Sequence, residues 1–348
     1  MKISIGTNIK DGPWGGGNLF AINLMNYLQN IGFEVINDLS DDDINIIILT
    51  EPRKTSESSA FTDLDVLKYK KYVNKECLVI HRINECDERK NTNYVNKYLI
   101  QANRVADATI FVSEWLKKLF LDQGLKSKEN YVVYAGADSN VFNADGFLPW
   151  DHKSKLKIVT HHWGANWNKG FDIYSELDNM LGSSKYKERI EFNYIGNLPK
   201  NFTFKNSNHI EPMSGKDLAD CIKTNHLYLT ASKNEPSGNH HIEGLQCGLP
   251  ILFLESGGTT EYCKDYGLGY TNETFVYQLN NMISNYDDYL IKAQDYPNNS
   301  DNMCSEYLRI INQINEGKDE FEPNPLFDNK NYISKYLYLK KRNFNSTN

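Results

Sequence analysis

LYLTASKNEPSGNHHIEGLQCGLPILFL, residues 227–254, is the stretch whose order of apolar and polar residues decides the fold class. Residues 227–232 predict a buried strand, KNEPSG predicts a turn, and residues 239–248 predict a helix that ends at Gly248. The apolar run 249–254 then predicts a second strand of a parallel sheet. A strand, a helix and a strand in this order indicate an α/β domain.

Two glutamates of this stretch, Glu235 and Glu243, have seven residues between them. Glu235 is placed in the loop after the first strand, and Glu243 about one turn into the helix. Open α/β sheets bind their ligands at this edge, and the free N–H groups at a helix start favour an anion. The pattern therefore predicts a site for a ligand that carries both phosphate and hydroxyl groups.

The same alternation of strands and helices extends over the chain of 348 residues, which is long enough for two domains. Residues 273–316 are expected to be helical, and the polar stretch 142–154 to be a linker between the domains. Two successive series predict an α/β fold with two Rossmann-like domains that face each other across a cleft. The strand candidates are residues 2–7, 33–36, 44–50, 77–81, 108–113 and 131–136 in the first series, and 155–162, 189–196, 227–232 and 249–254 in the second.

The bulk composition narrows the class of protein. A net charge of −7 disfavours nucleic-acid binding. The chain opens on MKISIG without a charged-then-apolar leader, and no apolar run reaches the roughly 18 residues that span a bilayer. The six cysteines have no CxxC or metal-finger spacing, which predicts reduced thiols in a cytoplasmic protein. Membrane contact through SEWLKKLF (113–120) is expected to be peripheral at most, and an ordinary solvated helix is the alternative.

Six sequence elements, taken in order, resemble the retaining glycosyltransferases of the GT-B fold, especially those of family four. The resemblance covers most of residues 1 to about 270. The elements are GPWGGGNLF (12–20), ATIFVSEWLKKLF (108–120), VVYAGADSNVFN (132–143), NWNKGFDIY (166–174), the Glu235–Glu243 pair with GLP (248–250), and SGGTTEY (256–262).

The resemblance implies an activity and a division of the chain. It implies transfer of a sugar from a UDP- or GDP-sugar to a hydroxyl of a glycan, lipid or other glycoconjugate. The anomeric configuration is retained, and neither a metal nor another cofactor is expected. Residues 1–150 would form the acceptor-side domain, residues 151–320 the donor domain, and residues 321–348 a tail with a return to the first domain as one option.

The resemblance also assigns donor-binding roles around the two glutamates. It implies that Glu243 holds the ribose and that Glu235 contacts the donor sugar. Carboxylates suit both roles because they accept paired hydrogen bonds from vicinal hydroxyls. Gly238, Asn239 and His240 would offer backbone amides to the sugar or the diphosphate. The alternative is that both glutamates are ordinary carboxylates of a loop and a helix.

The diphosphate requires cations, and the family uses an arginine and a lysine that precedes a glycine. Lys169, followed by Gly170, matches the lysine and is the candidate for stabilising the leaving phosphate. The arginine is missing, and His161 and His162 stand where it would be expected. His162 is the candidate substitute, and it would make the site more pH-dependent than an arginine would.

The glycine-rich loop of the first domain has no GK[ST] sequence and lacks the third glycine of a dinucleotide fingerprint. The family resemblance implies that this loop approaches the donor phosphate and the acceptor across the cleft. Gly15, Gly16 and Gly17 would permit a close backbone approach. A plain flexible turn is the alternative.

The strand CLVIHRINE contributes candidates near the acceptor. His81 is placed at the end of this strand, where the resemblance puts a histidine beside the reacting centre. Arg82 and Asn84 follow it as acceptor-side candidates, and a purely structural histidine is the alternative. Ser113 and Glu114 are further cleft candidates.

Several other functions are weighed against this one. The acidic runs 41–43 and 63–65 suggest a solvated turn and a helix rather than a metal-binding DxD motif. A nucleotide-sugar 2-epimerase would bind the same donor without needing an acceptor. The missing arginine motivates a catalytically silent sugar-nucleotide or glycan-binding protein. The incomplete glycine fingerprint disfavours an NAD oxidoreductase.

Overall fold

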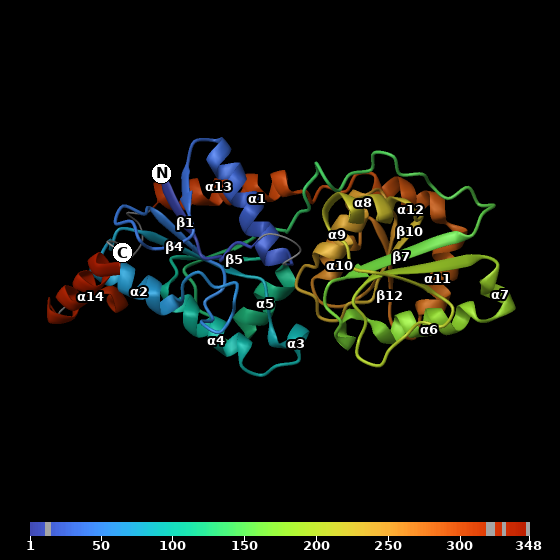
Figure 1. Ribbon diagram of the computed structural model, residues 1–348, viewed down its shortest axis with the longest axis horizontal. Helices are drawn as coiled ribbons and strands as arrows, with labels where there is room; N and C mark the ends of the chain where they lie inside the picture. The colour runs from blue at the N-terminus through green and yellow to red at the C-terminus, as the bar shows by residue number, and fades with distance from the viewer. Residues whose placement is uncertain (11–14, 318–323, 329–331, 346–348) are drawn as a thin grey trace.

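Two parallel sheets of six strands each organise the chain into two lobes. The computed structural model describes residues 1–10, 15–317, 324–328 and 332–345. Figure 1 shows the lobes side by side along the long axis of the molecule, each with helices on both faces of its sheet. This arrangement confirms the predicted α/β class with two Rossmann-like domains.

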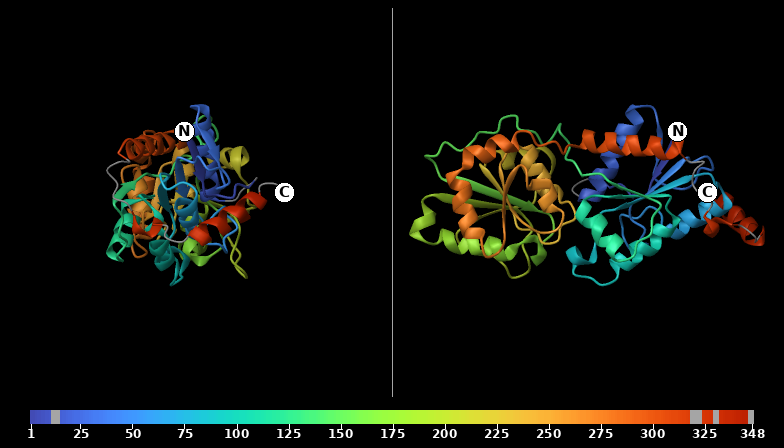
Figure 2. Two further views of the ribbon diagram at one scale, coloured as in Figure 1. Left: turned by 90° about the vertical axis from the view of Figure 1, so that its left-hand side faces the viewer. Right: turned by 180° about the vertical axis from the view of Figure 1, so that it is seen from behind.

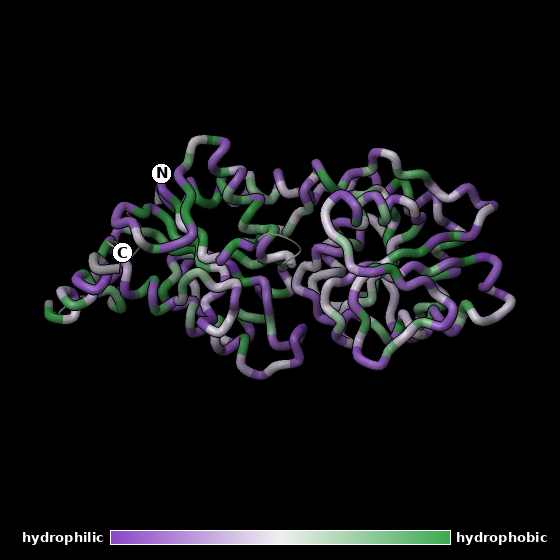
Figure 3. Tube along the Cα trace, in the orientation of Figure 1, coloured by the Kyte–Doolittle hydropathy of each residue, from purple (hydrophilic) through white to green (hydrophobic). Residues whose placement is uncertain are grey.

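The sheet of the first lobe is built from short apolar runs. All four residues of Ile46–Leu49 are buried, as expected for a parallel strand that is covered on both faces. Figure 3 shows apolar residues along the central strands of both lobes. In spatial order the strands are β2 (Glu34–Ile36), β1 (Lys2–Ile5), β3 (Ile46–Leu49), β4 (Leu78–Ile83), β5 (Ala108–Phe111) and β6 (Glu129–Val132).

Helices cover both faces of this sheet. One face packs against α1 (Gly16–Asn30) and α13 (Ser300–Glu316). The other packs against α2 (Asp63–Tyr72), α4 (Val95–Ala102) and α5 (Glu114–Asp122). The short helix α3 (Asp87–Lys90) follows β4 and faces the second lobe.

The second sheet has the strand order of a dinucleotide-binding fold, with the order reversing between its first and fourth strands, β7 and β10. The carboxyl ends of these two strands therefore form the expected ligand crevice. In spatial order the strands are β12 (Gly267–Tyr270), β11 (Ile251–Leu254), β10 (Leu227–Thr230), β7 (Leu156–His162), β8 (Ile190–Gly196) and β9 (Asn208–Ile210). The helical segments around it are η2 (Trp167–Lys169), α6 (Phe171–Leu181), α7 (Ser184–Lys187), α8 (Gly215–Lys223), α9 (Asn239–Gln246), α10 (Thr259–Cys263), α11 (Phe275–Ser284) and α12 (Tyr286–Ala293).

The chain returns to the first lobe through α13, which lies beside α1 in Figures 1 and 2. Its apolar side, which includes Tyr307 and Ile311, is part of the first-lobe core. At the crossing, the N–H of Ser300 donates to the carbonyl of Ala137 at 2.8 Å. The sequence placed residues 151–320 in the second domain, whereas this helix packs in the first.

The predicted tail, 321–348, lies partly outside the described residues. Its described part contains η4 (Pro325–Phe327) and α14 (Tyr332–Asn345). Both lie against α2 of the first lobe, and the rings of Tyr72 and Tyr338 are 5.3 Å apart. Among the described residues, no helix is both long and apolar enough to cross a membrane.

The lobes are joined on one side of the cleft by α10. The carboxylate of Glu261 accepts hydrogen bonds from the backbone N–H groups of Glu114 (2.8 Å) and Trp115 (2.5 Å) at the start of α5. The hydroxyl of Tyr262 donates to the carbonyl of Val112 at 2.6 Å. The two bonds to Glu261 satisfy N–H groups at the start of α5 with a side chain of the other lobe, and the bond from Tyr262 adds a third link between the lobes.

Gly170 gives a test of the close packing that places Lys169. It has a φ of +97°, and a Cβ atom there would lie 2.2 Å from the Cβ of Ala231. We expect Gly170→Ala to lower the free energy of unfolding by about 1 kcal/mol for the backbone, plus about 1–3 kcal/mol for the clash.

Gly146→Ala is the matched control, because Gly146 has a φ of +81° but no atom within 4 Å of the added Cβ. It should show the backbone cost alone, about 1 kcal/mol. Urea unfolding of both variants measures the difference. Equal losses of unfolding free energy in the two variants would show that Ala231 moves away from the added Cβ at no cost in free energy.

Candidate active site

A cavity of about 670 Å³ lies between the lobes, where the carboxyl ends of β7 and β10 meet α1 and the loop after β4. It brings together all of the predicted site residues except His81 and the two further cleft candidates, Ser113 and Glu114. From the first lobe these are Gly16, Gly17, Arg82 and Asn84; from the second they are His162, Lys169, Glu235, Gly238, Asn239, His240 and Glu243.

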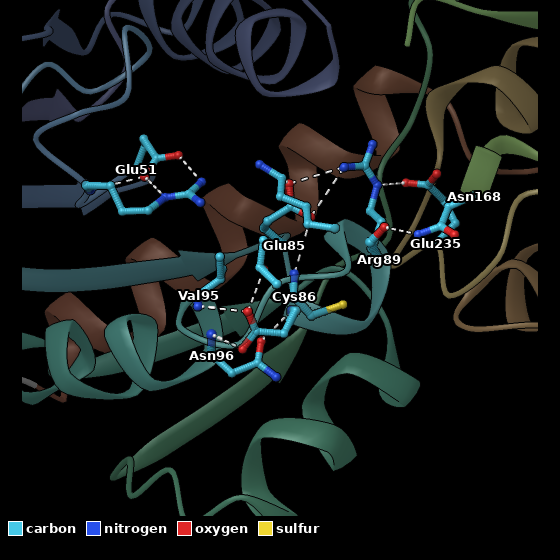
Figure 4. Close-up of polar contacts among 12 residues, drawn as sticks. Glu51, Glu85, Cys86, Arg89, Val95, Asn96, Asn168 and Glu235 are labelled. Atoms are coloured by element: carbon cyan, nitrogen blue, oxygen red, sulfur yellow. Dashed lines mark hydrogen bonds and ion pairs between the residues drawn. The ribbon is translucent and has the colours of Figure 1, made fainter. Parts of the chain in front are cut away.

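Glu235 lines this cavity and lies between two cations. Its Oε1 is 2.7 Å from Nε of Arg89, and its Oε2 is 2.7 Å from Nζ of Lys169. Figure 4 shows Arg89 reaching Glu235 from the other lobe. Burial alone would raise the pKa of Glu235, but Arg89 and Lys169 outweigh it and hold that pKa well below its usual range. The side chain is therefore a carboxylate, and it is only 5% exposed.

Lys169 ends the single turn η2, directly before the left-handed Gly170. Burial lowers the pKa of Lys169, and the ion pair with Glu235 opposes that shift. The pair thus holds a cation in a position with little solvent. Lys169 was predicted from the sequence, and the structure places its ammonium group against Glu235, in the loop that leads to α9.

The start of α9 is open toward the cavity. Gly238 precedes the helix with a φ of +85°, and no side chain caps it. A Cβ at Gly238 would lie 2.8 Å from the ring of His241 and 2.9 Å from Cγ of Glu235, so the turn has room for glycine only. The first N–H groups of a helix have no partner within it. Those of Asn239 and His240 therefore remain available to an anion.

The glycine-rich loop approaches this helix from the first lobe. A Cβ at Gly16 would lie 2.6 Å from Oδ1 of Asn239, whereas one at Gly17 would meet nothing within 4 Å. The predicted close approach is thus found at Gly16, against the side chain of Asn239. Residues 12–14 of the predicted loop lie outside the described residues.

Glu243 is held by a chain of hydrogen bonds. Its Oε2 is 2.7 Å from Nε2 of His161, and Nδ1 of His161 is 2.9 Å from the hydroxyl of Tyr228. That hydroxyl accepts from the backbone N–H of His161 at 3.2 Å, which leaves its own proton to donate to Nδ1. His161 then donates from Nε2 to Glu243. Among the described residues Oε1 of Glu243 has no hydrogen-bond partner, so it can accept from a ligand.

His162 is not suited to replace an arginine. Its Nε2 is 2.8 Å from the hydroxyl of Tyr174, and burial together with Lys169 lowers the pKa of His162 well below 6.5. A neutral imidazole lacks the charge of an arginine. His240 is also buried, with Nε2 2.7 Å from the hydroxyl of Thr230, and burial depresses its pKa in the same way.

His81 lies outside the cavity, contrary to the prediction. The strand β4 extends to Ile83, two residues beyond the predicted end, so His81 is an interior strand residue. It is fully buried, its Nδ1 is 2.8 Å from Oδ1 of Asn103, and burial lowers its pKa to about 4. Side chains alternate along a strand, so Arg82 and Asn84 face the cavity and His81 does not.

Arg89 is a site residue that was not predicted from the sequence. It lies on α3, and its Nη1 is 3.2 Å from Oε2 of Glu85, one turn earlier. That spacing of four residues was a weak signal for a helical ion pair, but it did not point to the cleft. Within the described residues, no group of three or more His, Cys, Asp or Glu side chains is arranged to hold a metal ion.

Comparison with known proteins gives similarity at the level of the fold. The sequence matches no protein-family model and no curated protein. The structure resembles HepE of Anabaena in complex with UDP-glucose, with a TM-score of 0.66, 13% identity, and coverage of 90% of this chain and 100% of that one.

Two further solved structures show the same similarity. WaaG, a glycosyltransferase involved in lipopolysaccharide biosynthesis, has a TM-score of 0.61 at 12% identity, with coverage of 89% of this chain and 99% of that one. Sucrose-phosphate synthase of Thermosynechococcus elongatus has a TM-score of 0.59 at 13% identity, with coverage of 90% and 98%. These similarities confirm the predicted GT-B fold.

Proposed function

We propose that the protein is a glycosyltransferase that moves a sugar from a nucleotide-sugar donor to an acceptor hydroxyl. The observation that carries the proposal is the cavity between the lobes, where Glu235, Lys169 and Glu243 surround the open start of α9. This arrangement offers carboxylates for hydroxyl groups and positive charge for a diphosphate. HepE, which has a similar fold, is described in complex with UDP-glucose.

In this proposal the donor lies across the carboxyl ends of β7 and β10. The ribose donates to the unpartnered Oε1 of Glu243, whose other oxygen is held by His161. The diphosphate faces the backbone amides of Asn239 and His240, and the sugar lies beside Glu235. The resemblance to family four favours UDP or GDP as the nucleotide.

The proposed chemistry depends on stabilising the departing diphosphate. Lys169 and the start of α9 supply fixed positive charge where negative charge develops. We propose that the acceptor attacks from the face of the leaving group and gives its proton to the leaving phosphate, so that configuration is retained. In this scheme the charge is supplied by the protein, and no metal is required.

The acceptor is proposed to be a glycan or another glycoconjugate that enters from the first lobe. Arg82 and Asn84 line that side of the cavity. The guanidinium carbon of Arg82 is 3.9 Å from the ring centre of Phe20, which fixes its direction. We also propose that the protein is cytoplasmic. If its acceptor is linked to a lipid, it would contact the membrane peripherally.

Release of nucleoside diphosphate from a panel of UDP-, GDP- and ADP-sugars, without added metal, tests the proposed activity. We expect slow release from one donor, and Glu243→Ala should weaken binding of that donor about 10-fold or more, because a ribose hydroxyl loses a charged acceptor. Glu176→Ala is the matched control, since Glu176 is exposed on α6 and lies outside the cavity.

The other outcomes separate the competing functions. Interconversion at C2 of the sugar without an acceptor would identify an epimerase. Donor binding without release, even with mixed glycan acceptors, would identify a silent binding protein. No binding of any sugar nucleotide would refute the proposal.

A further inference from the structure

Arg89 connects the first lobe to the loop that carries Glu235. Its Nε donates to Oε1 of Glu235 at 2.7 Å. Two hydrogen bonds from side chains of the second lobe hold the backbone of the same turn. The side-chain amide of Asn168 donates to the carbonyl of Arg89 at 2.9 Å, and the side-chain amide of Asn234 donates to the carbonyl of Glu88 at 3.3 Å. Figure 4 shows Arg89, Asn168 and Glu235 facing one another across the cleft.

The guanidinium of Arg89 retains free donors. Its Nη1 donates to Oε2 of Glu85 at 3.2 Å, and Nζ of Lys90 lies 2.9 Å from the same oxygen. Among the described residues, Nη2 of Arg89 has no hydrogen-bond partner, and the side chain lines the cavity. A guanidinium has five N–H donors in a planar fork that matches a phosphate group.

Two cations contact Glu235, and one of them, Arg89, also pairs with Glu85. The other is Lys169, and the neutral His162 adds no charge. Because the pKa of an arginine lies above 12, Arg89 stays charged where burial lowers the pKa of Lys169. The second cation that a diphosphate needs is therefore present, but it comes from the opposite lobe.

We propose that Arg89 binds the distal phosphate of a nucleoside diphosphate through Nη2 while its Nε keeps the bond to Glu235. The assignment rests on the proposed function. Glu243 marks the ribose end of the cavity and Glu235 the sugar end, so the phosphate beside Arg89 is the one that carries the sugar. Binding of the diphosphate then ties the two lobes together through Arg89.

Calorimetric affinities for UDP, UMP, GDP and GMP test this role. We expect Arg89→Ala to weaken binding of the preferred nucleoside diphosphate about 10- to 100-fold. Binding of the corresponding monophosphate should change less than about 2-fold, because only the diphosphate carries the distal phosphate. The diphosphate affinity of Arg89→Lys should lie between those of the wild type and Arg89→Ala, since a lysine keeps the charge but lacks the planar fork of N–H donors. Unchanged monophosphate binding also shows that the variant is folded.

Lys90→Ala is the matched control, because Lys90 lies on the same turn and contacts Glu85 but not Glu235. It should bind both nucleotides as the wild type does. Equal losses of monophosphate and diphosphate binding in Arg89→Ala would mean that Arg89 only holds the lobes, which overturns the inference. Undiminished diphosphate binding would overturn it as well. If the wild type bound neither diphosphate, the proposed function itself would fail.

Discussion

Replacing Lys169 by alanine should lower kcat for nucleoside-diphosphate release by about 10²- to 10³-fold, with a smaller change in KM for the donor. The ammonium group is buried and fixed by Glu235 at 2.7 Å, so it is in position before the reaction begins. A preorganised charge of this kind acts mainly where negative charge develops in the transition state. Steady-state release from the donor identified by the panel measures both constants.

Lys233→Ala is the control for this prediction. Lys233 lies near the same strand end, pairs with Asp172 at 2.6 Å and does not line the cavity. Its removal should change kcat by less than about 2-fold, as expected for an exposed ion pair. If Lys169→Ala kept kcat within about threefold of the wild type, Lys169 would not stabilise the leaving group.

The fold was largely predictable because parallel strands buried on both faces leave continuous apolar runs. The runs at 44–50 and 249–254 show this directly, and both are central strands. The strands β9 and β12 were missed. Both lie at the edges of the second sheet, and their sequences, NHI and GLGY, carry little apolar signal.

The return of α13 to the first lobe illustrates a second limit. The helical character of this segment was predicted, and helical periodicity shows that one side of a helix is buried. It does not show which sheet buries that side. Here Tyr307 packs on Phe20 of α1, and their ring centres are 5.0 Å apart. The two residues are nearly 290 positions apart in the sequence.

The site residues that belong to one short sequence motif could be predicted. Those that meet only because the two lobes lie close together could not. Glu235 and Glu243 share one strand, loop and helix, so their spacing fixes their relation. Arg89 meets Glu235 across 146 residues, and no local pattern encodes that contact. His162 was misjudged because the sequence does not reveal that burial keeps it neutral.

Replacing Glu235 by glutamine should lower the free energy of unfolding by about 3–5 kcal/mol at neutral pH. The variant keeps the shape of the side chain but leaves the buried Lys169 without its counter-charge, whereas Arg89 keeps its ion pair with Glu85. Removal of one partner from a buried ion pair costs this much because the remaining charge is neither solvated nor paired. Denaturant unfolding of both proteins measures the loss.

The loss should also depend on pH in a defined direction. Arg89 and Lys169 hold the pKa of Glu235 below its ordinary value of 4.5 in the folded protein, despite its burial. The stabilisation that this carboxylate provides is therefore fully present above about pH 4.5 and declines as the pH falls toward the lower folded pKa. The difference between wild type and Glu235→Gln should be largest near neutral pH and smaller in acid.

Glu255→Gln provides the comparison, because Glu255 follows the neighbouring strand β11 and has no ion-pair partner among the described residues. It should unfold like the wild type at every pH. A difference between wild type and Glu235→Gln that stayed constant from pH 7 to about pH 3 would contradict the argument, because it would arise from packing rather than from the charge of Glu235. A difference that shrinks in acid would show that the charge of Glu235 stabilises the fold by neutralising Arg89 and Lys169.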